Sequence, residues 1–167
     1  MSYSLSNVKR HNPADKPPVV MLSGVPGIGK TTAAASAPNP IFMCLEDGLG
    51  LNQAHTFQDE TIATWDEVIG YLGAMYTEKH DYKTLVVDSL SSLEPIIWKQ
   101  VALDNQVSTL EKLGFGKGYV MALDYWHQFL QGVIALRDHK GVMPILSAHV
   151  DIVRYDSPEV EPFERYQ

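Results

Sequence analysis

The chain has 167 residues, of which 45% are hydrophobic and 10% aromatic, so it can form one domain with a packed core. Its net charge of −7 argues against a surface that coats nucleic acid broadly, although it leaves room for a local basic groove assembled across subunits. The single cysteine, Cys44, excludes an intramolecular disulfide and a cysteine-based zinc site. No apolar run reaches membrane-spanning length and no signal-peptide pattern opens the chain, which predicts a cytoplasmic protein without a membrane partner.

Three regions are expected along the chain. Residues 1–18 are polar and contain three prolines that keep the backbone extended, so we expect an N-terminal arm. Residues 19–150 are expected to form the core. Residues 151–167 hold five acidic residues, two arginines and two prolines, and they are expected to form an acidic, loop-like tail.

The core opens with a β-favouring run, residues 19–23, which leads through a glycine-rich turn into the alanine-rich, helix-favouring run 31–37. The turn fits the phosphate-binding pattern G-x-x-x-x-G-K-S/T at every fixed position, from Gly24 to Thr31. The predicted nucleotide-binding residues are Gly24, Val25, Pro26, Gly27, Ile28, Gly29, Lys30, Thr31 and Thr32.

The chemistry of phosphate binding requires these residue types at this spacing. Glycines allow successive backbone N–H groups to surround a polyphosphate, and the helix that follows adds its unpaired N-terminal N–H groups. Lys30 is expected to reach the β- and γ-phosphates, and Thr31 is expected to place its hydroxyl on Mg²⁺. The turn therefore predicts a site for ATP and Mg²⁺.

An unbroken apolar run, residues 41–45, predicts a strand covered on both faces. Two acids, Glu46 and Asp47, follow it at the sheet edge where ligands bind in open α/β folds. Glu46 could alternatively be a solvated loop acid or a helix cap, since Asp47 stands beside it and could take its place. Further on, Thr64 and Glu67 predict a capping box for an amphipathic helix over residues 65–76.

The run 85–88 predicts the next buried strand, and it ends on Asp88. In P-loop NTPases an aspartate at this point holds the Mg²⁺ shell opposite the P-loop hydroxyl, so Asp88 and Thr31 are the predicted metal-binding residues. The alternative is that Asp88 caps the helix that follows it.

Two long helices are predicted next, one from Ser89 to about Lys112 and one over residues 120–139, with a glycine-rich break between them. A last strand, residues 142–148, precedes His149. Four strands that alternate with helices predict the α/β fold class, with a mainly parallel sheet flanked by helices. P-loop sheets commonly need at least one more strand, so either this is a truncated form of a longer core or a partner completes the sheet edge.

Three segments together resemble the RecA-type branch of P-loop ATPases, and specifically the phage RecA-like proteins of the nucleotide-binding and single-strand-annealing recombinase group. These segments are Gly24 to Thr32, the run FMCLEDGL at 42–49 and the run LVVDSL at 85–90. Residues 119–149 and the closing run 162–167 are also similar to the phage group. The resemblance thus covers almost the whole chain and implies a RecA-type P-loop core.

The resemblance also implies roles for single residues. Glu46 would be the base that polarises the attacking water, and Asp88 would support Mg²⁺. His149 stands where RecA has a glutamine that senses the γ-phosphate, and an imidazole can still donate a hydrogen bond to a phosphate oxygen. The alternative for His149 is a histidine satisfied by neighbouring backbone groups.

The same resemblance implies an ATPase of the bacterial host cytoplasm that assembles as a ring or filament on single-stranded DNA. It would promote annealing or strand exchange, with DNA-contacting loops at Gly114–Tyr119 and from Val150 onward, although both segments could be plain surface loops. A basic residue from the adjacent subunit would complete the pocket, with Lys117, Arg154 and Arg165 as candidates.

Two other functions stay open. A small P-loop kinase would need a lid with several arginines, and the chain has four arginines in all. The other alternative is a nucleotide-controlled protein-assembly module with no DNA role.

Overall fold

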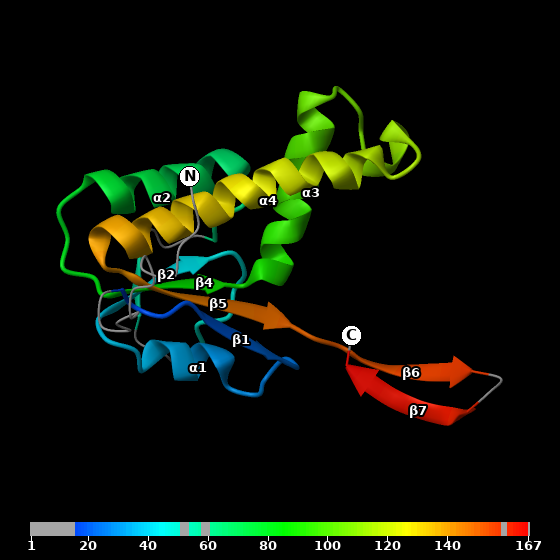
Figure 1. The fold of residues 1–167 in the computed structure, drawn as a ribbon, viewed down its shortest axis with the longest axis horizontal. Coiled ribbons are helices and arrows are strands. Elements are labelled where there is room, and N and C mark those ends of the chain that lie inside the picture. The colour runs from blue at the N-terminus through cyan, green and yellow to red at the C-terminus, as the bar shows by residue number, and fades with distance from the viewer. Residues whose placement is uncertain (1–15, 51–53, 58–60, 158–159, 167) are drawn as a thin grey trace, which may run out of the picture.

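The computed structural model describes residues 16–50, 54–57, 61–157 and 160–166. Its centre is a five-stranded sheet in the order β1-β5-β4-β2-β3, in which every neighbouring pair is parallel (Figure 1). The strands are β1 (Val20–Gly24), β2 (Pro40–Cys44), β3 (His55–Thr56), β4 (Thr84–Asp88) and β5 (Met143–His149). The predicted α/β class with a mainly parallel sheet is confirmed.

Helices cover both faces of this sheet. Figure 1 shows one helix, α1 (Lys30–Ala35), on one face, and α2 (Trp65–Thr77) and α4 (Lys117–Ala135) on the other. A further helix, α3 (Leu90–Asp104), packs against α4 and β5. The sheet is therefore the middle of three layers.

The strands β2 and β4 divide their side chains between two hydrophobic cores. Met43 and Val87 pack on the side of α2, α3 and α4, whereas Phe42 and Val86 pack with Ala34 of α1. All five side chains are 0% exposed, which confirms that these apolar runs are strands covered on both faces.

The parallel register brings the carboxyl ends of the strands to one edge of the sheet. Gly24 of β1 lies opposite His149 of β5, and Cys44 of β2 lies opposite Asp88 of β4. The register continues one residue beyond β2, because the Leu45 N–H donates to the Asp88 carbonyl at 2.8 Å. The glycine-rich turn, Glu46, Asp88 and His149 therefore all belong to the same edge.

The capping box predicted for α2 is present. The Thr64 hydroxyl accepts a hydrogen bond from the Glu67 N–H at 3.3 Å, and the Glu67 carboxylate accepts one from the Thr64 N–H at 2.9 Å. These reciprocal bonds satisfy backbone donors that have no partner inside the helix.

Two predicted helix ends are wrong. The first long helix, α3, ends at Asp104 rather than near Lys112, because Gln106 adopts a left-handed backbone with φ of 55° and a separate 3-10 helix forms over Leu110–Leu113. The second, α4, begins at Lys117 rather than at residue 120, directly after the left-handed Gly116. It continues into a π-helix, Leu136–Lys140, so its far end agrees with the prediction to within one residue.

The prediction of a loop for the tail is also wrong. Residues 152–166 contain an antiparallel hairpin, β6 (Ile152–Ser157) and β7 (Val160–Tyr166), which is separate from the main sheet (Figure 1). Both runs contain β-branched and aromatic residues, which favour strands, and the two strands pair with each other. This local preference outweighs the acidic composition.

The edges of the main sheet differ from each other. At one edge the short strand β3 was not predicted, because two residues give no periodic signal. At the other edge β1 pairs with β5 on one side, and its second side has no strand neighbour within the described ranges. The expectation that the sheet needs one more strand stays a prediction. This second side of β1 is where such a strand could pair.

The predicted N-terminal arm lies outside the described residues up to position 15. Residues 16 and 17 are bonded to the π-helix that continues α4. Lys16 Nζ pairs with Asp138 at 2.8 Å, and Arg137 Nε donates to the Pro17 carbonyl at 2.6 Å. The division into arm, core and tail remains a prediction.

Candidate functional site

The glycine-rich turn joins β1 to α1 in a conformation that needs its glycines. Gly27 and Gly29 have φ of 80° and 98°, in the left-handed region that side chains disfavour. Gly24 is needed for a different reason: a Cβ at this position would lie only 3.0 Å from Ile28 Cγ2. The turn is therefore curled and free of side chains at all three positions, as phosphate binding requires.

Lys30 folds back along this turn. Its Nζ donates to the Gly24 carbonyl at 2.8 Å and to the Val25 carbonyl at 3.2 Å. The same ammonium lies 3.2 Å from Nδ1 of His149. The structure therefore places the predicted phosphate-binding lysine beside the histidine at the end of β5.

The histidine connects the lysine to the first acid. An ammonium can only donate, so His149 Nδ1 accepts and the ring proton lies on Nε2. His149 Nε2 then donates to Glu46 Oε1 at 2.7 Å. Lys30, His149 and Glu46 thus form a continuous line of contacts across three strand ends.

Glu46 has further donors on its other oxygen. Ser92 donates to Oε2 at 2.5 Å, and Ser89 donates to the same atom at 3.1 Å. Burial by itself raises the pKa of Glu46, but the hydrogen bonds from Ser92 and His149 lower it, and the pKa ends below its ordinary value. Glu46 is therefore ionised at neutral pH and acts as an acceptor.

The second acid, Asp88, lies in a separate buried cluster. Thr31 Oγ1 donates to Asp88 Oδ2 at 2.8 Å, and Ser147 Oγ donates to Asp88 Oδ1 at 2.5 Å. Asp88 is 3% exposed, so these two hydroxyls replace its hydration. The structure brings together Thr31 and Asp88, the two residues predicted to hold the metal.

Asp47, the alternative to Glu46, does not join either cluster. Asp47 is exposed, while Glu46 pairs with His149. Cys44, at the end of β2, is not a reactive thiol: burial raises its pKa to about 11, with smaller contributions from the negative charges of Asp88 and Asp47.

Comparison with protein families agrees with this geometry. A family model described as an AAA domain matches residues 16–167, which is nearly the whole chain. The chain belongs to the AAA domain family. No curated protein matches the sequence. The AAA domain makes the chain a nucleotide-binding protein of the P-loop ATPase type, and the narrower resemblance to phage RecA-like proteins remains a prediction.

The residues of this AAA domain fit the nucleotide and metal that such domains use. The glycine turn and Lys30 offer N–H and ammonium donors to phosphates, and Thr31 and Asp88 offer the hard oxygen atoms that Mg²⁺ prefers. Among the described residues no group of three or more His, Cys, Asp or Glu side chains could hold a metal ion. Mg²⁺ does not need such a group, because it is usually bound by one or two carboxylates together with substrate phosphates. Thr31 and Asp88 supply two protein oxygens for it.

The two segments predicted to contact DNA lie beyond the same sheet edge. Figure 1 shows the α3–α4 connection and the β6–β7 hairpin projecting on the side toward which the β5 arrow points. Phe115 is fully exposed in the first segment, and Tyr119 contacts the Trp98 ring edge-on at 5.6 Å. No helix of the described chain is long and apolar enough to cross a membrane.

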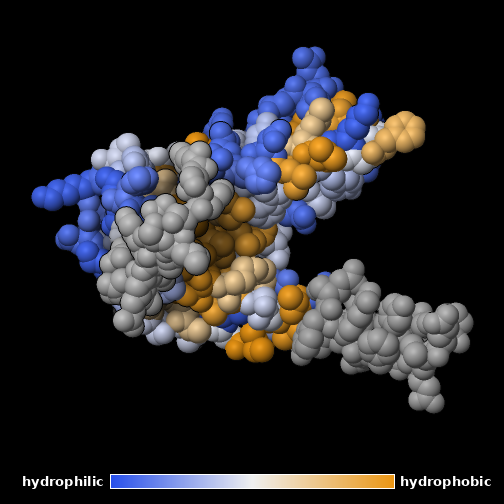
Figure 2. All heavy atoms as spheres, viewed as in Figure 1, coloured by the Kyte–Doolittle hydropathy of each residue, from blue (hydrophilic) through white to orange (hydrophobic). Residues whose placement is uncertain are grey.

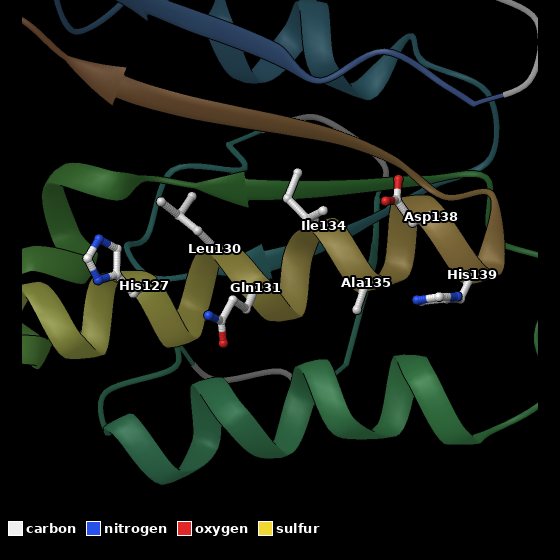
Figure 3. A pocket seen from close by; sticks show the side chains of 7 residues that line it. All are labelled: His127, Leu130, Gln131, Ile134, Ala135, Asp138 and His139. Carbon is white, nitrogen blue, oxygen red and sulfur yellow. The ribbon is translucent and has the colours of Figure 1, made fainter. Parts of the chain in front are cut away.

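A cavity of about 410 Å³ lies elsewhere, along α4 and the π-helix. Figure 3 shows Leu130 and Ile134 pointing from α4 toward the sheet. The cavity shares no residue with the glycine turn or the two acid clusters. It is lined by His127, Leu130, Gln131, Ile134, Ala135, Asp138 and His139.

Three serines of this site were missed from the sequence. Ser147 is the only polar residue of β5 before the terminal His149, which is a signal that could have identified it. Ser89 and Ser92 read as ordinary residues of a helix start, and nothing local indicates that they face an acid more than 40 positions away.

Proposed function

We propose that this AAA domain is a Mg²⁺-dependent ATPase that acts on single-stranded DNA in phage recombination, by annealing or strand exchange. The observation that carries the hydrolytic part is the line of contacts from Lys30 through His149 to Glu46, beside the Thr31–Asp88 pair. A phosphate-binding lysine, a metal-binding pair and an ionised carboxylate are the three parts that P-loop hydrolysis needs.

The protein residues have distinct roles in the proposed reaction. The glycine turn and Lys30 hold the phosphates, and Thr31 and Asp88 hold Mg²⁺, which supplies charge neutralisation when bound. Glu46 accepts a hydrogen bond from the water that attacks the γ-phosphorus as the bond to the bridging oxygen breaks. Lys30 separates from His149 Nδ1 when the lysine turns to phosphate.

The proposed DNA role is argued separately from the proposed hydrolysis. It rests on the resemblance to the phage group and on the two projecting segments, which carry Lys117, Arg154 and Arg165. These three residues are also the candidates for the basic group that a neighbouring subunit contributes in a ring or filament. Base stacking on exposed aromatics such as Phe115 would be compatible with single strands.

One alternative is favoured by a specific observation. The second side of β1 has no strand neighbour in the described chain, and Met21 of this strand is 55% exposed. A nucleotide-controlled assembly module would use such an edge to pair with another chain. The kinase alternative lacks this kind of support. A kinase lid would need several arginines, and Arg137, one of the four in the chain, is bonded to the Pro17 carbonyl and to Asp138.

The test is ATP turnover by the full chain, with and without a single-stranded oligonucleotide, while particle size is followed by light scattering. The proposal expects turnover that rises with single strands and particles larger than the monomer. It also expects Glu46→Gln to bind ATP but to turn over at least about a hundredfold more slowly, the typical loss for general-base help. Turnover indifferent to single strands would reject the DNA role, and normal turnover by Glu46→Gln would reject the hydrolytic role of Glu46.

A further inference from the structure

The first turn of α3 contacts both flanks of the candidate site. Ser89 and Ser92 reach Glu46 beyond β2, and Ser91 Oγ accepts the His149 N–H of β5 at 3.0 Å. Ser89 follows Asp88 directly, and Ser91 and Ser92 lie in the next helical turn, so the strand that carries the predicted metal-binding acid positions all three serines. One helical turn thus contacts three neighbouring strand ends.

The contacts around Glu46 differ in length. The 2.5 Å contact from Ser92 is the shortest that Glu46 makes, while Ser89 lies 3.1 Å from Glu46 and 3.3 Å from Ser92. A serine has one hydroxyl proton, so the short contact assigns the Ser92 proton to Glu46. Ser92 is therefore the main donor, and Ser89 supports the same oxygen.

These donors limit where Glu46 can accept a water. A carboxylate has about four acceptor sites, two on each oxygen. Ser92 and Ser89 occupy both sites on Oε2, and His149 occupies one site on Oε1. The remaining site lies on Oε1, the oxygen that faces His149 and, beyond it, Lys30.

We propose that Ser92 is a positioning residue for the reaction: its hydroxyl holds Glu46 Oε2 so that Oε1 accepts the attacking water on the phosphate side. This inference rests on the proposed function, because it assumes that Glu46 is the base. Loss of the Ser92 hydroxyl frees the Glu46 side chain to rotate. The carboxylate then spends less time in the orientation that suits attack, while the phosphate-binding turn is unchanged.

The test compares four variants with the native chain and with Glu46→Gln, by ATP turnover and by calorimetric ATP affinity. Ser92→Ala is expected to lower kcat roughly tenfold while the Kd for ATP stays within about twofold, because the lost interaction orients a base and does not bind the nucleotide. Ser92→Thr keeps the hydroxyl and is expected to retain most of kcat. Thr77→Ala, which removes a helix hydroxyl bonded to the Gly73 carbonyl far from the site, is the control for hydroxyl loss.

The fourth variant combines Ser92→Ala with Glu46→Gln. The proposal expects the double variant to be no slower than Glu46→Gln alone, because Ser92 acts through Glu46. Two outcomes would overturn the positioning role while leaving the ATPase proposal intact. In the first, the kcat losses of Ser92→Ala and Glu46→Gln multiply in the double variant. In the second, Ser92→Ala has a kcat within twofold of the native chain. Normal turnover by Glu46→Gln alone would remove both proposals together.

Discussion

The two acids of this AAA domain illustrate how environment separates two chemically similar side chains. Asp88 is 3% exposed and satisfied by hydroxyls from Thr31 and Ser147, which is the environment of a structural or metal-binding carboxylate. The Glu46 side chain is 30% exposed, and one of its acceptor sites stays open. Accessibility to water therefore favours Glu46, rather than Asp88, as the group that meets a reacting water.

A first residue-scale prediction concerns Lys30. Replacement by alanine is expected to lower ATP affinity by at least roughly a hundredfold, because charge-assisted hydrogen bonds to phosphate oxygens contribute about 1.5–3 kcal/mol each. Calorimetric titration with Mg-ATP measures the change. Lys99→Ala, at an exposed position of α3, is the matched control, and undiminished affinity in Lys30→Ala would refute the phosphate role.

A second residue-scale prediction concerns acid stability. The folded-state pKa of Glu46 lies below its ordinary value, so its charged form stabilises the fold above the unfolded pKa of about 4.3, and this contribution is lost as the pH falls through the folded pKa. Native chain and Glu46→Gln should thus differ in free energy of unfolding at pH 7 and converge toward pH 3. Urea titrations at both pH values measure the gap, and a gap that does not change would contradict the pKa direction.

At the scale of elements, α4 and the 3-10 helix before it approach each other closely at Gly118. A Cβ on Gly118 would lie 2.4 Å from Leu110 Cγ and 2.9 Å from the Leu110 carbonyl oxygen. This packing explains why a glycine, which is a poor helix former, stands near the N-terminus of α4. At Gly118 the backbone of α4 approaches the buried Leu110. Glycine at Gly73 of α2 has no such neighbour.

These two glycines give a matched pair of substitutions. Gly118→Ala is expected to destabilise the protein by about 1–3 kcal/mol through overpacking, and Gly73→Ala to stabilise it by about 0.4–1 kcal/mol by reducing the entropy of the unfolded chain. Urea midpoints at constant slope measure both. Similar shifts of the same sign in the two variants would show that the contact with Leu110 is unimportant.

At the scale of the whole molecule, the layered fold leaves one side incompletely covered. Val19 and Met21 beside β5 are 44% and 55% exposed, and Leu130 and Ile134 of α4 are 40% and 37% exposed. Figure 2 shows hydrophobic residues gathered on this face between the helices and the lower strands. Because β1 also has an unpaired side in the described chain, this region is where the proposed self-association would bury apolar surface.

The corresponding prediction places a charge on that edge. Met21→Lys is expected to shift the protein toward the monomer, since a lysine on an edge strand opposes strand pairing between copies. Sedimentation velocity with and without Mg-ATP measures the distribution. Leu103→Lys, at a position of α3 that is 60% exposed, controls for the added charge, and equal assembly in all three proteins would exclude this edge as the contact between copies.

Local sequence patterns by themselves determined the glycine turn, the four main strands, the α2 capping box and the row of polar residues after the strands. These features depend on neighbouring residues, through backbone sterics, periodicity and turn chemistry. Only the tertiary structure decided that Glu46 rather than Asp47 bonds to His149 beside Lys30, that Ser147 satisfies Asp88, and that Ser92 holds Glu46. Each of these outcomes depends on distances between segments far apart in the chain, which strand order and register set after the core has packed.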